Sequence, residues 1–139
     1  MRHPKMPCTE GGIRVELPKI LIVDDMQIIR DVLFKWFSER GFDVRVAQDG
    51  AEGVSMAKAL RFSVIVMDVE MPRMNGVAAI REIREFDSDI PILILSGYSS
   101  VEAELGTLEV SAVLRKPFRL EEVEAAVRAA MRPAGAPPV

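Results

Sequence analysis

The chain has 139 residues, of which 49% are hydrophobic and 28% are charged, and its formal net charge is −3. These values favour one globular domain with a real core and give no sign of a nucleic-acid-binding surface. One cysteine, Cys8, and one histidine, His3, exclude a disulfide framework, a cysteine zinc site and Ser-His or Cys-His catalysis. The sequence shows no secretory signal pattern and no apolar run of membrane-spanning length, so we expect a cytoplasmic protein.

Strand and helix patterns alternate along the middle of the chain. Residues 1–18, with three prolines and a Gly-Gly pair, are predicted to be a flexible extension, and residues 132–139 a flexible tail. Apolar runs predict strands, helical periodicity predicts helices, and Gly41 is expected to end the first helix. The predicted strands are 19–25, 42–47, 62–68, 90–96 and 111–116, and the predicted helices are 27–40, 49–60, 76–86, 99–109 and 119–131.

Four of the five predicted strands are aliphatic rather than alternating, which indicates burial on both faces. Such strands, separated by helices, are typical of a parallel sheet covered by helices in an α/β fold. Right-handed crossovers place the C-terminal ends of all the strands at one edge, where ligands of open α/β sheets bind. The polar residues that end these strands are therefore expected to converge: Asp24, Asp25, Asp68, Ser96 and Lys116.

The chemistry of this polar cluster points to phosphoryl transfer. Two adjacent carboxylates about 4 Å apart repel by roughly 4 kcal/mol at an effective dielectric of about 20, so they require a positive partner or a shared proton. Three carboxylates form an oxygen-rich site that suits Mg²⁺ and leaves coordination positions open. Lys116 and Ser96 add a cation and a hydroxyl donor. A metal and a lysine neutralise phosphoryl oxygens, and a carboxylate can be the nucleophile.

Four segments carry a resemblance to a known family: LIVDD, VMDVEMPRMNG, LILSGYS and LRKPF. They occur in this order and at close to the family's spacing. From about Lys19 to Met131 the chain resembles the receiver domain of bacterial two-component response regulators, in a single-domain form similar to chemotaxis regulators. The resemblance implies a doubly wound, flavodoxin-like sheet of five parallel strands in the order 2-1-3-4-5, with helices on both faces.

The resemblance also assigns roles by position. Asp68 matches the phosphoacceptor, Ser96 the switch hydroxyl and Lys116 the lysine that pairs with a phosphoryl oxygen. Pro117 resembles a cis proline that follows this lysine, and Gly76 permits a tight bend into the third helix.

The metal site is assigned in the same way. Asp24 and Asp25 match the acidic pair that holds Mg²⁺, with Asp25 as a direct ligand. Asp68 completes the carboxylate set, and Glu70 lies where the family offers a backbone carbonyl to the metal. Mn²⁺ is expected to substitute for Mg²⁺.

Two departures from the family pattern stand out. Val113 occupies a position where receivers commonly carry Tyr or Phe, which puts in doubt the coupling between the switch hydroxyl and an aromatic rotamer. The spacing from Ser96 to Lys116 is about two residues short, and Gly106 weakens the predicted fourth helix. We expect this helix to be short and mobile, and to become ordered on phosphorylation or partner binding. The side chain of Glu70 is expected to alter the lifetime of the phosphorylated state.

The predicted function is a stand-alone regulator that accepts a phosphoryl group on Asp68. The donor is a histidine kinase or a phosphotransfer protein, the reaction depends on Mg²⁺, and it switches binding to a downstream protein. No nucleic-acid or membrane partner is expected. The chain is not expected to be an enzyme beyond promoting its own phosphorylation and dephosphorylation.

Three alternatives remain open at this point. The chain could be a receiver-like module that binds partners without phosphorylation, which Val113 and the short fourth helix leave possible. An aspartate-dependent phosphatase usually places its carboxylates as D-x-D after the first strand, whereas here the acceptor follows the third strand and position 70 is glutamate. A flavin carrier needs a phosphate-binding loop after the first strand, where DDMQII would repel phosphate.

Overall fold

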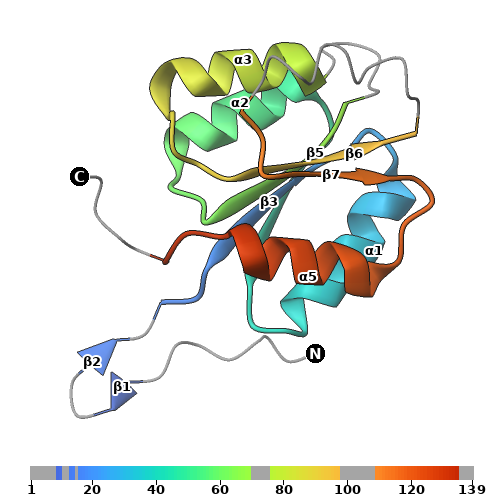
Figure 1. Ribbon diagram of the computed structural model, residues 1–139. Helices are drawn as coiled ribbons and strands as arrows, with labels where there is room; N and C mark the ends of the chain where they lie inside the picture. Colours follow the sequence, from blue (N-terminus) through green and yellow to red (C-terminus); the bar gives the residue numbers. More distant parts are fainter. Residues whose placement is uncertain (1–8, 11–12, 15, 70–75, 98–108, 135–139) are drawn as a thin grey trace.

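The molecule is built around one parallel sheet (Figure 1). The computed structural model describes residues 9–10, 13–14, 16–69, 76–97 and 109–134. The sheet has the order β4-β3-β5-β6-β7, which confirms the predicted order 2-1-3-4-5. Its strands are β3 (Lys19–Val23), β4 (Asp43–Ala47), β5 (Val64–Asp68), β6 (Ile92–Ser96) and β7 (Ala112–Arg115).

Helices cover both faces of this sheet. Figure 1 shows α2 and α3 above the sheet and α1 and α5 below it. Their bounds are α1 (Gln27–Ser38), α2 (Gly50–Ala59), α3 (Gly76–Phe86) and α5 (Leu120–Ala130). The predicted helix at 99–109 falls almost entirely outside the described residues. The α/β class and the doubly wound arrangement are therefore confirmed.

The central strands bury side chains on both faces. In β3, Ile20 and Ile22 pack toward α1 and α5, whereas Leu21 and Val23 pack toward α2 and α3. Every residue of β5 and β6 is buried. A fully buried aliphatic side chain contributes about 1.5–3 kcal/mol, so these strands supply much of the stability that offsets the chain's conformational entropy.

Two elements are less buried than their sequences predict. Residues of β7 alternate between half-buried and exposed, and Val113 is 39% exposed. In α1, Leu33 is buried, but Ile28 is 65% and Val32 42% exposed. The apolar residues of α1, which recur with a helical period, span a wider arc than the sheet and α5 cover.

The helix ends follow local signals. Gly41 has a φ of 89°, a left-handed conformation that glycine adopts without strain, and it lies just beyond the end of α1. The Asp49 carboxylate caps α2 by accepting the N–H of Glu52 at 2.9 Å. The Glu122 carboxylate accepts the N–H of Arg119 at the start of α5.

A polar and aromatic contact joins α1 to α5. The indole Nε1 of Trp36 donates to Glu124 at 3.0 Å, and Arg40 forms an ion pair with the same carboxylate. The Arg40 guanidinium also stacks over the Trp36 ring, 3.5 Å from its centroid. One carboxylate of α5 thus holds two side chains from the α1 side.

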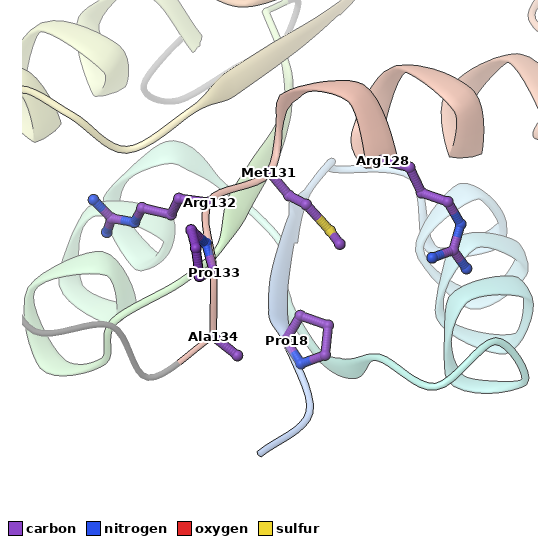
Figure 2. Close-up of a pocket in the computed structure, with 6 residues that line it drawn as sticks. All are labelled: Pro18, Arg128, Met131, Arg132, Pro133 and Ala134. Atoms are coloured by element: carbon purple, nitrogen blue, oxygen red, sulfur yellow. The ribbon is translucent and has the colours of Figure 1, made fainter. Parts of the chain in front are cut away.

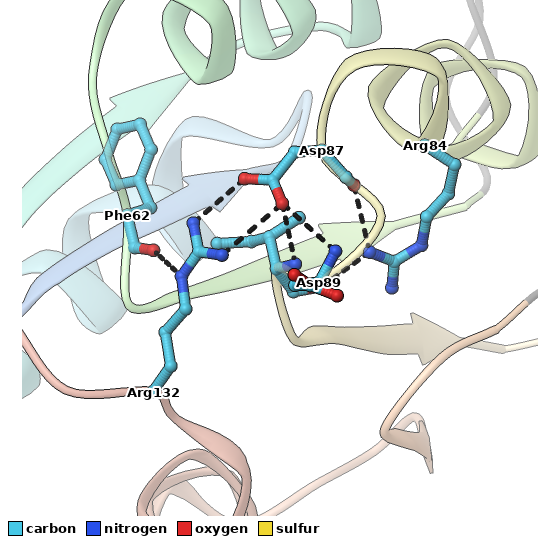
Figure 3. A network of polar contacts seen from close by, with 6 residues as sticks. Phe62, Arg84, Asp87, Asp89 and Arg132 are labelled. Carbon is cyan, nitrogen blue, oxygen red and sulfur yellow. Dashed lines mark hydrogen bonds and ion pairs between the residues drawn. The ribbon is translucent and has the colours of Figure 1, made fainter. Parts of the chain in front are cut away.

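At the N-terminal edge of the sheet, Arg132 ties the end of α5 to two loops (Figure 3). Its guanidinium donates to both oxygens of Asp87, at 3.3 and 2.9 Å, and to the carbonyl of Phe62 at 2.9 Å. Its backbone N–H donates to the carbonyl of Ser63 at 3.0 Å. We call this set of contacts the arginine clamp; it reaches past Met131, where the sequence places the domain boundary.

The predicted N-terminal extension contains a two-residue antiparallel pairing. Strand β1 (Thr9–Glu10) pairs with β2 (Ile13–Arg14), separate from the main sheet. Among the helices that the structure describes, none combines the length and apolar character needed to cross a bilayer.

Candidate functional site

Three carboxylates meet at the C-terminal edge of the sheet. Asp24 directly follows β3, and Asp68 is the last residue of the neighbouring strand β5. One ligand oxygen from each of Asp24, Asp25 and Asp68 lies within 4.8 Å of the others. Asp24 and Asp68 are buried, with 0% and 1% exposure, whereas Asp25 is exposed. We call this cluster the acidic site; the sequence predicted its three members.

The surroundings of Asp24 in the site disfavour its ionised form. Burial raises its pKa to about 6; the Met26 N–H and Lys116 oppose this rise, and the charges of Asp68 and Asp25 reinforce it. Its Oδ1 accepts the Met26 N–H at 2.9 Å. Its Oδ2 is buried and has no hydrogen-bond partner among the described residues. A buried carboxylate oxygen without a donor is suited to a bound cation.

Lys116 supplies the positive charge of the site. Its Nζ lies 3.2 Å from Asp68 Oδ1. Its backbone N–H donates to the Ser96 carbonyl at 2.8 Å, which sets the lysine beside the end of β6. Ser96 is 1% exposed and ends the strand that pairs with β5. The Lys116–Pro117 peptide bond is cis, as the resemblance implies.

Gly76 lets α3 begin directly against the strand that carries Asp68. A Cβ at this position would lie 2.6 Å from both the Asp68 carbonyl oxygen and the Val69 Cα. The Gly76 N–H donates to the Val69 carbonyl at 3.2 Å. The need for glycine here arises from this close backbone approach, since its φ is not in the left-handed region.

The residues of the acidic site fit Mg²⁺. Hard oxygen ligands, one of them buried without a donor, match the preference of this cation for carboxylates combined with water. Asp24, Asp25 and Asp68 would hold it, and the exposure of Asp25 leaves room for water ligands. Glu70, whose carbonyl was predicted to join them, lies outside the described residues.

Sequence reasoning missed two groups at this site. The Met26 N–H fixes Asp24 Oδ1, and Arg30 in α1 donates from Nη1 to the Asp24 carbonyl at 2.8 Å. The first contact belongs to a local turn, and an Asp two residues before the N–H donor is a sequence signal for such a turn. The second had only a weak signal, a basic residue one helical turn into α1.

A separate hollow of about 340 Å³ lies at the opposite edge of the sheet (Figure 2). It is bordered by Pro18, which precedes β3, and by the segment Met131–Ala134, which follows α5. None of the residues of the acidic site lines it. The hollow is therefore separate from the site predicted for phosphoryl transfer.

Comparison with known proteins identifies the family and the fold. The family model described as response regulator receiver domain matches residues 20–128. The chain belongs to this family. Receiver domains as a family carry the phosphoacceptor role in two-component systems and bind Mg²⁺ in an acidic pocket.

Relatives of this receiver domain include longer proteins. Response regulator MprA of Mycolicibacterium vanbaalenii is 39% identical over 116 residues, which cover 82% of this chain and 50% of MprA. The chain thus spans about half the length of the curated relatives that it matches.

Solved structures of receiver domains superimpose well. Chemotaxis protein CheY4 of Vibrio cholerae has a TM-score of 0.77 at 29% identity, over 83% of this chain and 99% of that one. Response regulator TrrA of Thermotoga maritima, in complex with Mg²⁺-BeF, has a TM-score of 0.76 at 27% identity, over 82% and 99%. These likenesses agree with the sheet order and with the acidic site.

Proposed function

We propose that this receiver domain accepts a phosphoryl group on Asp68 in a Mg²⁺-dependent reaction and thereby switches its binding to another protein. The observation that carries the proposal is the meeting of three carboxylates and Lys116 around the end of β5. Structural residues rarely gather three like charges at a buried strand end without a positive ligand.

The reaction is a transfer between two nucleophiles. A carboxylate oxygen of Asp68 attacks the phosphorus of a phosphohistidine, the new P–O bond forms as the P–N bond breaks, and the histidine nitrogen keeps the electron pair. Mg²⁺, when bound, neutralises charge on the transferred phosphoryl oxygens. Lys116, already 3.2 Å from Asp68, is placed to pair with one of these oxygens.

The switch follows from the added charge. Phosphorylation adds about −1.5 to −2 charges and three acceptor oxygens at Asp68. Lys116 exchanges its carboxylate partner for a phosphoryl oxygen, and the Ser96 hydroxyl turns to donate to another. The backbone N–H of Lys116 donates a hydrogen bond to the Ser96 carbonyl. Both responses therefore act on the ends of β6 and β7.

The partners are a donor and a target. The donor is a histidine kinase or a phosphotransfer protein, and the target is a downstream protein recognised through the changed surface. The chain acts on no external substrate and promotes only its own phosphorylation and dephosphorylation, in the cytoplasm. Mn²⁺, another oxygen-preferring divalent cation, is proposed to replace Mg²⁺.

Intact-mass measurement tests the proposal. The chain is incubated with acetyl phosphate, with and without Mg²⁺. We expect a gain of one phosphoryl group that requires Mg²⁺ and that Asp68→Asn abolishes. Asp31→Asn, which removes an exposed carboxylate from α1, serves as the matched control and should leave the gain intact. Unchanged mass in the wild type, or full modification of Asp68→Asn, would refute the proposed function.

A further inference from the structure

Arg30 connects helix α1 to the loop that carries the acidic pair. Its backbone N–H donates to the Met26 carbonyl at 3.1 Å, as part of the first turn of α1. Its side chain turns back past the start of the helix, and Nη1 donates to the Asp24 carbonyl oxygen at 2.8 Å. One residue therefore bonds to the backbone on both sides of Asp25.

Three hydrogen bonds, one of them from Arg30, hold Asp24 in place. Its N–H donates to the Ala47 carbonyl at 3.1 Å, its Oδ1 accepts the Met26 N–H, and its carbonyl accepts Arg30. The only polar atom of Asp24 left without a described partner is Oδ2. Because the carbonyl held by Arg30 belongs to the peptide that joins Asp24 to Asp25, the bond restricts rotation of both residues.

This restriction matters because the acidic site is self-repelling. Three carboxylate oxygens within 4.8 Å of one another favour any motion that separates them. Asp25 is exposed and lies in the loop between β3 and α1, so it is the member most able to turn away. A fixed Asp24–Asp25 peptide removes that motion before a cation arrives, and the cation then gains affinity from the prior order.

We propose that Arg30 is a positioning residue of the acidic site, which holds the Asp24–Asp25 peptide in the orientation that binds Mg²⁺. This inference rests on the proposed function. Arg30 touches neither the cation nor the phosphoryl group, and it acts only through the Asp24 carbonyl. Residues that orient metal ligands in this way typically change metal affinity by about 10–100-fold when they are replaced.

The positive charge of Arg30 and its hydrogen bond to the Asp24 carbonyl predict opposite changes in Mg²⁺ affinity when Arg30 is removed. A guanidinium near a cation site repels Mg²⁺, so its removal should tighten binding if charge were the dominant effect. If the hydrogen bond to the Asp24 carbonyl dominates, its removal weakens binding. The sign of the change therefore distinguishes the two explanations.

The test is a Mg²⁺ titration of the full chain followed by amide chemical shifts. We expect Arg30→Met to raise the Mg²⁺ dissociation constant about tenfold. Lys35→Met is the matched control, since it removes the same charge from an exposed position on α1. It should change the dissociation constant by less than about twofold, because exposed charges far from the site are screened. Arg30→Lys, which keeps a donor, should recover part of the loss.

A second readout separates positioning from a general loss of structure. In Arg30→Met, the Mg²⁺ concentration needed for half-maximal phosphorylation by acetyl phosphate should rise about tenfold. The rate at saturating Mg²⁺ should stay near that of the wild type. Arg30→Gln, whose shorter side chain does not reach the Asp24 carbonyl, replaces Arg30→Met if the latter does not fold.

Two results would overturn the proposal. Equal or tighter Mg²⁺ binding by Arg30→Met, beside a wild type that binds Mg²⁺, would refute the role of Arg30 and leave the proposed function standing. A wild type that binds no Mg²⁺ would refute both.

Discussion

The two edges of the sheet use charge in opposite ways. At the C-terminal edge, the acidic site collects carboxylates, and burial together with neighbouring charges raises the pKa of Asp24 to about 6. At the N-terminal edge, burial alone would raise the pKa of Asp87, but the Arg132 guanidinium and the N–H groups of Asp89 and Ile90 outweigh it and hold that pKa below its usual range. The first edge gathers carboxylates whose repulsion is only partly neutralised, whereas the second neutralises its charge within the chain.

The two edges therefore differ in role within one small domain: the arginine clamp stabilises the fold, and the acidic site is suited to binding a cation. The arginine clamp joins the end of α5 to the loops before β5 and β6, so its charges stabilise the fold. In the acidic site, Lys116 offsets only part of the repulsion between the carboxylates, and a bound cation would relieve more of it. Functional sites commonly reduce stability in this way, and other parts of the chain offset the loss.

The largest expected effect concerns the backbone contact beneath the acidic site. Gly76→Ala should lower the free energy of unfolding by about 3 kcal/mol, because the added Cβ would overlap the backbone of Asp68 and Val69. Urea denaturation measures the loss. Gly53→Ala, whose Cβ would lie nearest to the Val23 side chain, at 3.0 Å, is the control and should cost less. Equal losses would mean that the backbone overlap at Gly76 costs no more than the side-chain contact at Gly53.

The next effect tests the clamp. Arg132→Met should lower the free energy of unfolding by about 2 kcal/mol, because Asp87 is left half-buried without its bidentate partner. Arg128→Met removes the same group from the end of α5, where the ion pair to Glu124 is more exposed, and should cost less than about 1 kcal/mol. If both variants lose the same stability, the clamp is no stronger than a surface ion pair.

The third effect, about as large as the second, has the opposite sign. Without Mg²⁺, Asp24→Asn should raise the free energy of unfolding by about 2 kcal/mol near pH 8, because it removes a buried charge from a repelling cluster. Its Mg²⁺ affinity should fall at the same time. Urea denaturation in Mg²⁺-free buffer measures the gain, and a less stable variant would contradict the contrast between the two edges.

The pH dependence sharpens this last prediction. The folded state holds the Asp24 proton up to about pH 6, whereas the unfolded chain releases it near 3.8. The wild type therefore loses stability as pH rises through this window, and the advantage of Asp24→Asn should vanish near pH 4. Asp87→Asn should behave in reverse: its cost should be full at neutral pH and shrink in acid, where the lowered pKa no longer keeps the wild-type carboxylate charged.

The sequence predicted those parts of the site that strand geometry determines. Asp24 follows β3, Asp68 ends β5 and Lys116 follows β7. Parallel strands bring their C-terminal ends together whatever the sequence distance between them. Arg30 was missed because a long side chain on a helix has many rotamers, and periodicity does not show which backbone carbonyl it reaches. The role of Ser96, the carbonyl of Glu70 and the fourth helix stay predictions.

The fold was likewise predictable where burial is two-sided. The runs in β3, β5 and β6 indicated strands inside a sheet, and the structure buries them. Arg132 was placed in a tail because prolines and glycine follow it, and a single arginine that fits between two loops leaves no periodic signal. Ile28 and Val32 follow the helical period of α1 but are exposed, because the period gives the direction of an apolar face but not its width.

The stacked indole on α1 has a practical consequence. The chain has a single tryptophan, Trp36, held between the Arg40 guanidinium and the Glu124 carboxylate. Its fluorescence therefore arises from one known environment, at the contact between the helix that begins beside the acidic loop and the last helix of the domain. The native protein thus carries an intrinsic optical reporter of that helix contact, which needs no label.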